Sequence, residues 1–225
     1  MRLTVENVTY RYRNSNSYAV KGVNCAFDRG KLYAIMGPSG SGKSTILSMV
    51  AGLDIPADGS IRFGDGLLSE MDLDRYRRDD VSIIFQAFQL FPLLTAVENV
   101  CYPMEISGVS PKEAIPKAQE YLLRVGITGE KFKRFPSNMS GGEQQRVAIA
   151  RSLASGAKVI LADEPTGNLD IANTEIIMGL LQSLAYEDGY CVIVVTHDID
   201  VANKADVVYR MSDGTMAEIG NEALA

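Results

Sequence analysis

The sequence predicts an α/β fold with a mainly parallel sheet, and three observations carry that prediction. The segments KVILADE (158–164) and CVIVVTH (191–197) are near-continuous apolar runs, which are typical of strands buried on both faces of a parallel sheet. A third apolar run, KLYAIMG (31–37), leads directly into the glycine-rich loop GPSGSGKST (37–45). The segment after that loop carries apolar residues at helical spacing, so a strand, a glycine loop and a helix follow one another.

The strand and helix patterns can be assigned in order along the chain. The first third is rich in strands, because LTVENVTY (3–10) and AVKGVNCAF (19–27) are short, turn-bounded and partly alternating. The helix after the glycine loop has Ile46, Met49, Val50 and Leu53 on one stripe. These segments indicate an N-terminal β subdomain attached to the sheet.

The middle of the chain changes character after the apolar strand VSIIF (81–85). Residues 88–138 read mostly as helices broken by prolines and a glycine, which predicts a helical subdomain of about 88–140 inserted into the core. A further helix is expected at 141–154, and residues 198–225 supply a helix and one or two short strands. No linker interrupts the pattern, so residues 1–225 are expected to form one domain.

Composition narrows the class of protein. The 225 residues are 46% hydrophobic and 22% charged, which is ordinary for a globular chain with one sizeable core. The apolar runs are far shorter than the roughly 20 residues of a membrane span, and the first residues lack a signal-peptide apolar region, so a cytoplasmic location is expected. The net charge of −6 argues against a nucleic-acid partner. Three widely spaced cysteines (Cys25, Cys101 and Cys191) fit no metal or redox pattern and are expected to be buried.

The glycine loop satisfies the pattern G-x-x-x-x-G-K-[ST] of a phosphate-binding loop. Glycines let successive backbone N–H groups turn inward as an anion nest, and the helix that follows adds its positive dipole end. Lys43 can reach the outer phosphates, and the Ser44 hydroxyl suits Mg²⁺. The expected nucleotide-binding residues of this loop are Gly37, Pro38, Ser39, Gly40, Ser41, Gly42, Lys43, Ser44 and Thr45.

Polar residues follow three of the predicted strands at the sheet edge where ligands bind in open α/β sheets. Asp163 and Glu164 end VILADE; Asp163 is expected to hold Mg²⁺, and Glu164, whose side chain diverges from its neighbour, to polarise an attacking water. Gln86 follows VSIIF and is expected to touch both metal and water. His197, the single histidine, ends CVIVVT and is expected to contact a terminal phosphate.

A second glycine pair opens the helix at MSGGEQQR (139–146). Ser140 and Glu143 fit the capping box S-x-x-E, which explains both residues without a ligand. The capping box does not explain Gly141 and Gly142, since glycine costs a helix about 1 kcal/mol relative to alanine. Glycines there let an anion approach the exposed N–H groups, so a second anion site is predicted. It serves either the same nucleotide or one held by a second copy of the chain.

These motifs, in this order, resemble the ATP-binding cassette ATPases over essentially all 225 residues. GPSGSGKST, Gln86, MSGGE, VILADE, GNLD and His197 carry the resemblance. It implies a RecA-like P-loop core with an antiparallel β subdomain and a helical insertion, ATP and Mg²⁺ as ligands, and ATP hydrolysis. It further implies a head-to-tail homodimer in which Ser140, Gly141, Gly142 and Glu143 clamp the ATP of the other subunit.

The resemblance implies roles for two further parts of the chain, and this sequence differs from the usual family pattern at two positions. Residues Asn168, Leu169 and Asp170 match the loop that crosses the dimer axis, and Tyr12 matches the aromatic residue that stacks on adenine. Tyr10 is the weaker candidate, and a strand tyrosine packed in the sheet is the alternative for Tyr12. Met139 stands where the family usually has leucine, and Glu143 where it usually has glutamine. The added charge could weaken affinity for phosphate unless the carboxylate points back into its capping role.

Within the family, FQAFQLFPLLTAVENV (85–100) and LADEPTGNLD (161–170) look most like the ATPases of lipoprotein-release, macrolide-efflux and peptide-antibiotic-resistance systems. That implies a separate membrane permease as partner and a position at the inner face of the cell membrane. Apolar residues near Gln86 are candidates for docking it, or else fill the core of the helical subdomain. They are Phe88, Leu90, Phe91, Leu93, Leu94, Tyr102 and Met104.

Three other classes of protein agree less well with these motifs. The tetrapeptide NKAD (203–206) spells the guanine-reading motif of GTPases, but it lies in a helix-like segment rather than at the end of a buried strand. A small-molecule kinase would leave MSGGE without a role. An ATPase of repair or translation, the remaining non-transport alternative, usually has two cassettes or a long coiled-coil insertion.

Overall fold

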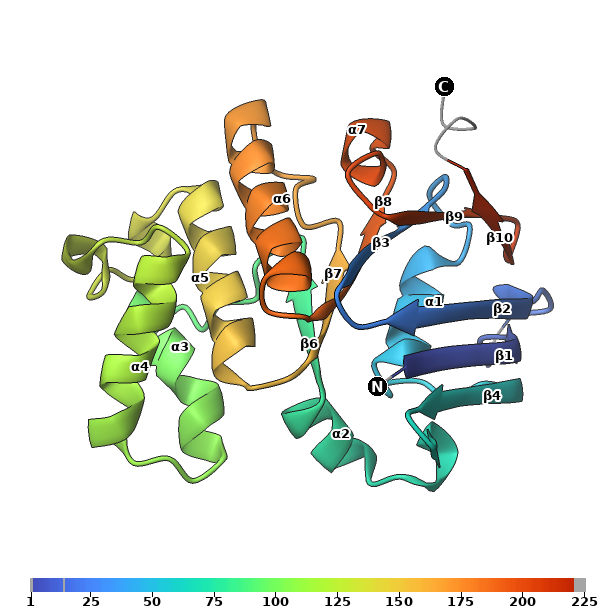
Figure 1. The fold of residues 1–225 in the computed structure, drawn as a ribbon, viewed down its shortest axis with the longest axis horizontal. Coiled ribbons are helices and arrows are strands. Elements are labelled where there is room, and N and C mark those ends of the chain that lie inside the picture. Colours follow the sequence, from blue (N-terminus) through green and yellow to red (C-terminus); the bar gives the residue numbers. More distant parts are fainter. Residues whose placement is uncertain (1, 14, 221–225) are drawn as a thin grey trace.

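The computed structural model describes residues 2–13 and 15–220, and a six-stranded sheet lies at its centre (Figure 1). Five neighbouring strands of this sheet run parallel, and the edge strand β10 pairs antiparallel with β9. The arrangement confirms the predicted α/β class. In spatial order the strands are β10 (Thr215–Ile219), β9 (Val207–Ser212), β3 (Lys31–Met36), β8 (Cys191–Thr196), β7 (Val159–Asp163) and β6 (Val81–Phe85).

Alternate residues of the central strands divide the core between the two faces of the sheet. On β8, Val192 and Val194 face one cluster of buried side chains, whereas Ile193 and Val195 face the other. Because side chains alternate along a strand and both faces are covered, the strands read as continuous apolar runs.

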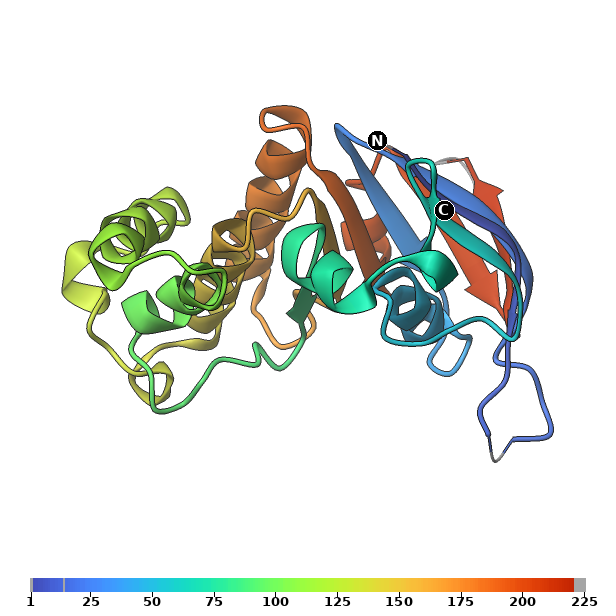
Figure 2. The same cartoon turned by 90° about the horizontal axis from the view of Figure 1, so that it is seen from below.

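A second, four-stranded antiparallel sheet covers one face of the core, as predicted for the N-terminal third. Its order is β2 (Val20–Asp28), β1 (Arg2–Tyr10), β4 (Asp58–Phe63) and β5 (Gly66–Leu67). Helix α1 (Lys43–Val50) lies between this sheet and the central one (Figure 2). Ile46, Met49 and Val50 are buried as expected, but the helix ends before Leu53, which is 54% exposed; the prediction for Leu53 was wrong.

The helical part lies on the opposite side of the molecule, where α3 (Ala96–Ile106), α4 (Pro111–Arg124) and α5 (Gly141–Ala154) pack together (Figure 1). The first helix begins at Ala96, later than the expected boundary near 88, because a capping box of Thr95 and Glu98 sets its start. Two short 3₁₀ turns, η2 (Gly129–Lys131) and η3 (Pro136–Asn138), connect α4 to α5.

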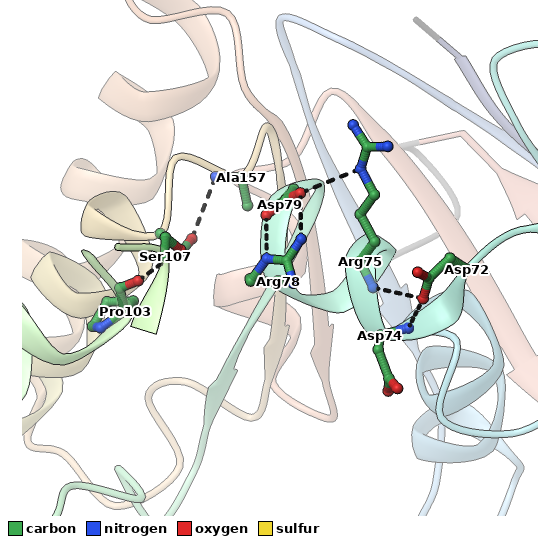
Figure 3. A network of polar contacts seen from close by, with 9 residues as sticks. Asp72, Asp74, Arg75, Arg78, Asp79, Pro103, Ser107 and Ala157 are labelled. Carbon is green, nitrogen blue, oxygen red and sulfur yellow. Dashed lines mark hydrogen bonds and ion pairs between the residues drawn. The ribbon is translucent and has the colours of Figure 1, made fainter. Parts of the chain in front are cut away.

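Helix α2 (Leu73–Asp79) was not foreseen from the sequence. It follows the 3₁₀ turn η1 (Leu68–Glu70), and Asp72 caps it by accepting the backbone N–H groups of Asp74 and Arg75 (Figure 3). Asp79 in its last turn pairs with Arg75 and Arg78, and Arg78 holds the pKa of Asp79 below its usual value. These local contacts and a single buried residue, Tyr76, stabilise the helix. The sequence did not predict it because it has no apolar stripe.

The remaining helices are α6 (Ile171–Tyr186) and α7 (Ile199–Ala202). The tetrapeptide 203–206 follows α7 as a turn, so the expectation that it lies inside a helix was wrong, although it does not end a buried strand either. Asp206 Oδ2 accepts the backbone N–H of Leu32 at 2.8 Å, which gives its carboxylate a role in anchoring β3. No helix within residues 2–13 and 15–220 is long and apolar enough to cross a membrane.

The cysteines behave largely as predicted. Cys101 and Cys191 are buried and Cys25 is partly buried, all as free thiols. Burial raises the pKa of Cys101 to about 11 and that of Cys191 to about 12, which keeps these thiols protonated and unreactive.

Candidate nucleotide-binding site

Four strands of the central sheet end at the same edge and deliver the predicted polar residues there. β3 leads into the glycine loop, β6 into Gln86, β7 into Glu164 and β8 into His197. A cleft of about 720 Å³ opens at this edge. Its lining residues are Tyr12, Ala19, Pro38, Ser39, Gly40, Gly42, Lys43, Ser44, Thr45, Gln86, Glu164 and His197.

The glycines of the phosphate loop are required by the chain's own backbone. Gly42 has a φ of 107°, in the left-handed region that favours glycine, and a Cβ there would overlap the carbonyl oxygen of Ala19. At Gly37 a Cβ would overlap the carbonyl oxygen of Met211. Gly40 also has a positive φ, but nothing lies within 4 Å of where its Cβ would be. The backbone of Ala19 and Met211 therefore requires glycine at positions 42 and 37 of this loop.

The donor groups of this loop fit a polyphosphate. The Lys43 ammonium donates to the carbonyl oxygens of Gly37 (2.8 Å) and Pro38 (3.0 Å), which leaves one of its three protons uncommitted. The buried hydroxyl of Ser41 has no partner among the described residues. Because buried polar groups are normally paired, this hydroxyl suits an anion-binding loop.

Asp163 and Ser44 form the oxygen-donor pair that a magnesium ion needs. Ser44 Oγ donates to Asp163 Oδ1 at 3.2 Å although 119 residues separate them. Burial raises the pKa of Asp163 above its usual value, and the hydrogen bond from Ser44 and the charge of Lys43 oppose that rise. A carboxylate and a hydroxyl beside a phosphate loop are hard oxygen ligands, and Mg²⁺ typically takes few protein ligands and completes its shell with phosphates and water. The residues present fit the ion.

The side chain of Glu164 contacts His197, whereas that of Asp163 contacts Ser44. Oε1 of Glu164 lies 2.9 Å from Nδ1 of His197, and the Glu164 side chain is only 17% exposed. The Glu164 backbone has a φ of 48°, a conformation that is costly for a non-glycine residue and that clusters at functional sites. The pair places a carboxylate and an imidazole together on the wall of the cleft.

Gln86 and Asn168 join the cleft to the GNLD segment. Asn168 Nδ2 donates to the backbone carbonyl of Gln86 at 3.1 Å, and the Gln86 amide lies 3.4 Å from Asn168 Oδ1. Leu169 packs partly on the core, and Asp170 caps α6 through the N–H of Asn173 at 2.7 Å. The two contacts of Asn168 with Gln86 tie this segment to a residue that lines the cleft.

Tyr12 lies at the mouth of the cleft with half of its surface exposed. Its hydroxyl is 2.8 Å from Oγ1 of Thr45, and its ring meets Tyr10 edge-on at 5.1 Å. Tyr10 instead donates to Asp54 and does not line the cleft, which favours Tyr12 over Tyr10 as the ring available to a base.

The MSGGE segment does not line the cleft of its own chain: the described lining residues include none from 139–146. Ser140 and Glu143 form the predicted capping box, with Oε2 of Glu143 accepting the Ser140 N–H at 2.8 Å. The two glycines differ. A Cβ on Gly142 would overlap the Asn173 amide, so packing within the chain accounts for that glycine, whereas a Cβ on Gly141 meets only ordinary contacts at 3.5 Å.

The two unusual residues of this segment are both accommodated. The Glu143 carboxylate turns back into the cap and also pairs with Lys131 Nζ at 2.6 Å, and Lys131 and the cap together lower its pKa. Met139 is buried, 7% exposed, within the core of the helical part, as an apolar replacement for leucine should be.

The apolar residues near Gln86 divide into three groups. Phe91, Leu93 and Tyr102 are exposed, with Leu93 at 87%. Phe88, Leu90 and Leu94 are partly buried. Met104 is 6% exposed and belongs to the core, so its inclusion among docking candidates was wrong.

Three residues that fix this region were not singled out from the sequence. Arg151 on α5 donates to the carbonyl oxygens of Gln89 (2.6 Å) and Phe88 (3.2 Å), both of which have positive φ. Gln145, fully buried, donates to the Pro165 carbonyl just beyond Glu164. Lys131 reaches Glu143. The sequence offered one indication for Arg151. It is a charged residue four positions after Val147, and so lies on the same face of the helix as the apolar stripe.

A phosphate loop at the end of a central parallel strand, with an acid pair at the end of another, defines a P-loop nucleotide-binding protein. The comparisons with known proteins give its family. The ABC transporter family matches residues 20–167. The chain is 40% identical to the uncharacterized ABC transporter ATP-binding protein YclH of Bacillus subtilis, over 99% of this chain and 98% of that one.

Solved structures agree. The dimeric cassette MJ0796 bound to ADP and Pi has a TM-score of 0.88 at 40% identity, covering 97% of this chain and 98% of that one. The corresponding Methanocaldococcus jannaschii sequence is 43% identical over 94% of each chain. A macrolide export ATP-binding/permease protein of Rhodopirellula baltica is 40% identical over 93% of this chain, which spans 31% of that protein.

The chain therefore belongs to the ABC transporter family. It is an ATP-binding domain of that family, and its reaction is the hydrolysis of ATP with Mg²⁺. The fold class and the resemblance inferred from the motifs are both confirmed.

Proposed function

We propose that two copies of this chain close head-to-tail around two ATP molecules, each bound by the phosphate loop of one copy and the Ser140–Gly141 helix start of the other. One observation carries the proposal. The phosphate loop, Glu164 and His197 share one cleft, while the glycine-bearing start of α5 does not line it and its Gly141 has room for a methyl group within its own chain. The similar cassette MJ0796 is dimeric, which supports the pairing of two copies.

Within that dimer the residues of the cleft have separate roles. Residues 37–45 and Lys43 bind the phosphates, Ser44 and Asp163 hold Mg²⁺ with Gln86 nearby, and Tyr12 supports the base. Glu164 takes a proton from the attacking water, and His197, bonded to Glu164, orients that carboxylate and reaches toward the terminal phosphate. Residues 168–170 lie at the contact between the copies. Bound Mg²⁺ would neutralise charge on the phosphate oxygens.

The partner is a separate membrane permease, and residues 1–225 act as a single domain at the inner face of the membrane. The side chains of Phe91, Leu93 and Tyr102 are exposed, and the rings of Phe91 and Tyr102 pack at 4.6 Å, which offers an apolar surface to a docked permease. Relatives named as macrolide export proteins support an export-type system, and a relative described as part of the transporter complex cbiONQ supports assembly with other subunits.

The test is Glu164→Gln, which keeps the hydrogen-bonding shape but removes the base. ATP hydrolysis should fall by about 10²- to 10⁴-fold, because general bases contribute that much. The variant should form dimers with ATP and Mg²⁺ on size-exclusion chromatography. A variant that stays monomeric at saturating ATP contradicts the cross-chain clamp. Co-purification from detergent-solubilised membranes tests the permease separately, and failure there favours a non-transport ATPase.

A further inference from the structure

The carboxylate of Glu143 has both of its oxygens engaged by groups of its own chain. Oε2 accepts the Ser140 N–H at 2.8 Å, and Oε1 lies 2.6 Å from Nζ of Lys131, the last residue of η2. Only 12% of the Glu143 side chain and 29% of the Lys131 side chain are exposed. This pair lies at the helix start that the proposed dimer presents to the terminal phosphate of the partner's ATP.

An isolated carboxylate at this position has two opposing effects. It stabilises the first turn of α5 through the helix dipole and the cap. It also repels a phosphate that approaches the same N–H groups, and this repulsion grows where the dimer excludes water. The hydrogen bond and charge of Lys131 lower the pKa of Glu143, so protonation does not remove the charge near neutral pH. A neighbouring cation has to compensate it.

We propose that Lys131 is a positioning residue of the cross-chain ATP site. It neutralises Glu143 and holds the carboxylate turned back toward Ser140, so that the helix start stays attractive to the partner's phosphate. This inference rests on the proposed dimer and adds to it a residue outside the recognised motifs.

The backbone around Lys131 is fixed independently of Glu143. Val97 N donates to the Phe132 carbonyl at 3.0 Å, and Ala96 N donates to the Arg134 carbonyl at 2.8 Å, which ties this segment to the start of α3. Replacement of the Lys131 side chain should therefore leave the fold intact. An effect on ATP affinity that is larger than the effect on the free energy of unfolding separates the proposed role from a structural one.

The experiment measures the ATP dependence of hydrolysis for Lys131→Met, which keeps the aliphatic stem. We expect the apparent KM for ATP to rise about tenfold, because the uncompensated Glu143 carboxylate then repels the partner's phosphate, with kcat changed by less than about twofold. Lys131→Arg should restore the parental KM. The matched control is Lys133→Met, which makes the same charge change at an exposed site two residues away and should not alter KM.

The decisive comparison uses Glu143→Gln as background, because glutamine can still cap the helix but carries no charge. There Lys131→Met should change KM by less than about twofold, since no charge remains to be compensated. An equal rise in both backgrounds, or no rise in either, overturns the proposal. If Lys131→Met alone does not fold, a folded Lys131→Met/Glu143→Gln protein supports charge compensation, and an unfolded one overturns it.

One experiment distinguishes an error in the role of Lys131 from an error in the proposed dimer. In a Glu164→Gln background, the amount of ATP needed for dimerisation is compared with and without Lys131→Met. If Glu164→Gln alone stays monomeric, the proposed function is wrong. If it dimerises and Lys131→Met leaves the required ATP concentration unchanged, only the role of Lys131 is wrong. A requirement raised by about tenfold supports both.

Discussion

The two glycine-bearing loops, 37–45 and 139–146, differ in what requires their glycines. In the first, Gly37 and Gly42 are required by the backbone of Met211 and Ala19, and the loop lines the nucleotide cleft of its own chain. In the second, Gly141 has room for a methyl group and does not line that cleft. Gly141 is therefore available for the close approach of a second copy that the proposed dimer requires.

Gly142 shows why the two glycines of the second loop should not be treated as one signal. Asn173 fills the space above Gly142, and Asn173 is itself held by two hydrogen bonds to the side chain of Asp170 and a contact with Arg146. That glycine joins α5 to α6 within one chain. Gly141 and the exposed Ser140 are left as the part of the loop available to a partner.

The largest expected effect tests the first loop. Lys43→Ala should weaken nucleotide binding by about 10²-fold or more, because it removes a charged partner from a partly buried phosphate site. Titration with a fluorescent ATP analogue measures it. Lys112→Ala, an exposed lysine on α4, should bind nucleotide like the parent. Unchanged affinity in Lys43→Ala would show that residues 37–45 do not bind the nucleotide. The contrast between the two glycine-bearing loops would then have no basis.

A smaller effect separates the two glycines of the second loop. Gly142→Ala should lower the free energy of unfolding by about 1–3 kcal/mol, because its Cβ overlaps Asn173. Gly141→Ala should leave it unchanged or raise it by up to about 1 kcal/mol, since alanine favours a helix. Urea denaturation measures both.

The Gly141→Ala variant also tests whether a second copy of the chain approaches this glycine. Gly141→Ala should fold normally and yet, combined with Glu164→Gln, need more ATP to dimerise on size-exclusion chromatography. Dimerisation at the unaltered ATP concentration would show that no partner group comes close to Gly141.

The smallest effect concerns the mouth of the first loop. Tyr12→Ala should weaken ATP binding by about 1–3 kcal/mol, the range for loss of one stacked base. Tyr12→Phe keeps the ring and loses only the bond to Thr45, so it should cost less. Calorimetric titration of both variants provides the measurement. Equal losses in the two would assign the contribution to the hydroxyl and place the adenine elsewhere.

Five features could be placed from the sequence alone: the phosphate loop, the acids at the end of β7, Gln86, His197 and the parallel sheet. Each of these depends on residues that are neighbours in the chain: a strand that runs into a loop, or a polar residue that ends an apolar run. Local spacing is sufficient for such features, because backbone geometry alone decides where the next residue lies.

The residues that hold the site in place could not be found without the three-dimensional fold. Lys131 reaches Glu143 across 12 positions and Arg151 reaches Gln89 across 62, while Leu53 lies exposed and Met104 buried against expectation. No periodicity encodes these outcomes. The contacts of Lys131 and Arg151 and the burial of Met104 depend on how the helical part packs, which is set by shape and burial among side chains distant in the chain. Leu53 is exposed because α1 ends before it.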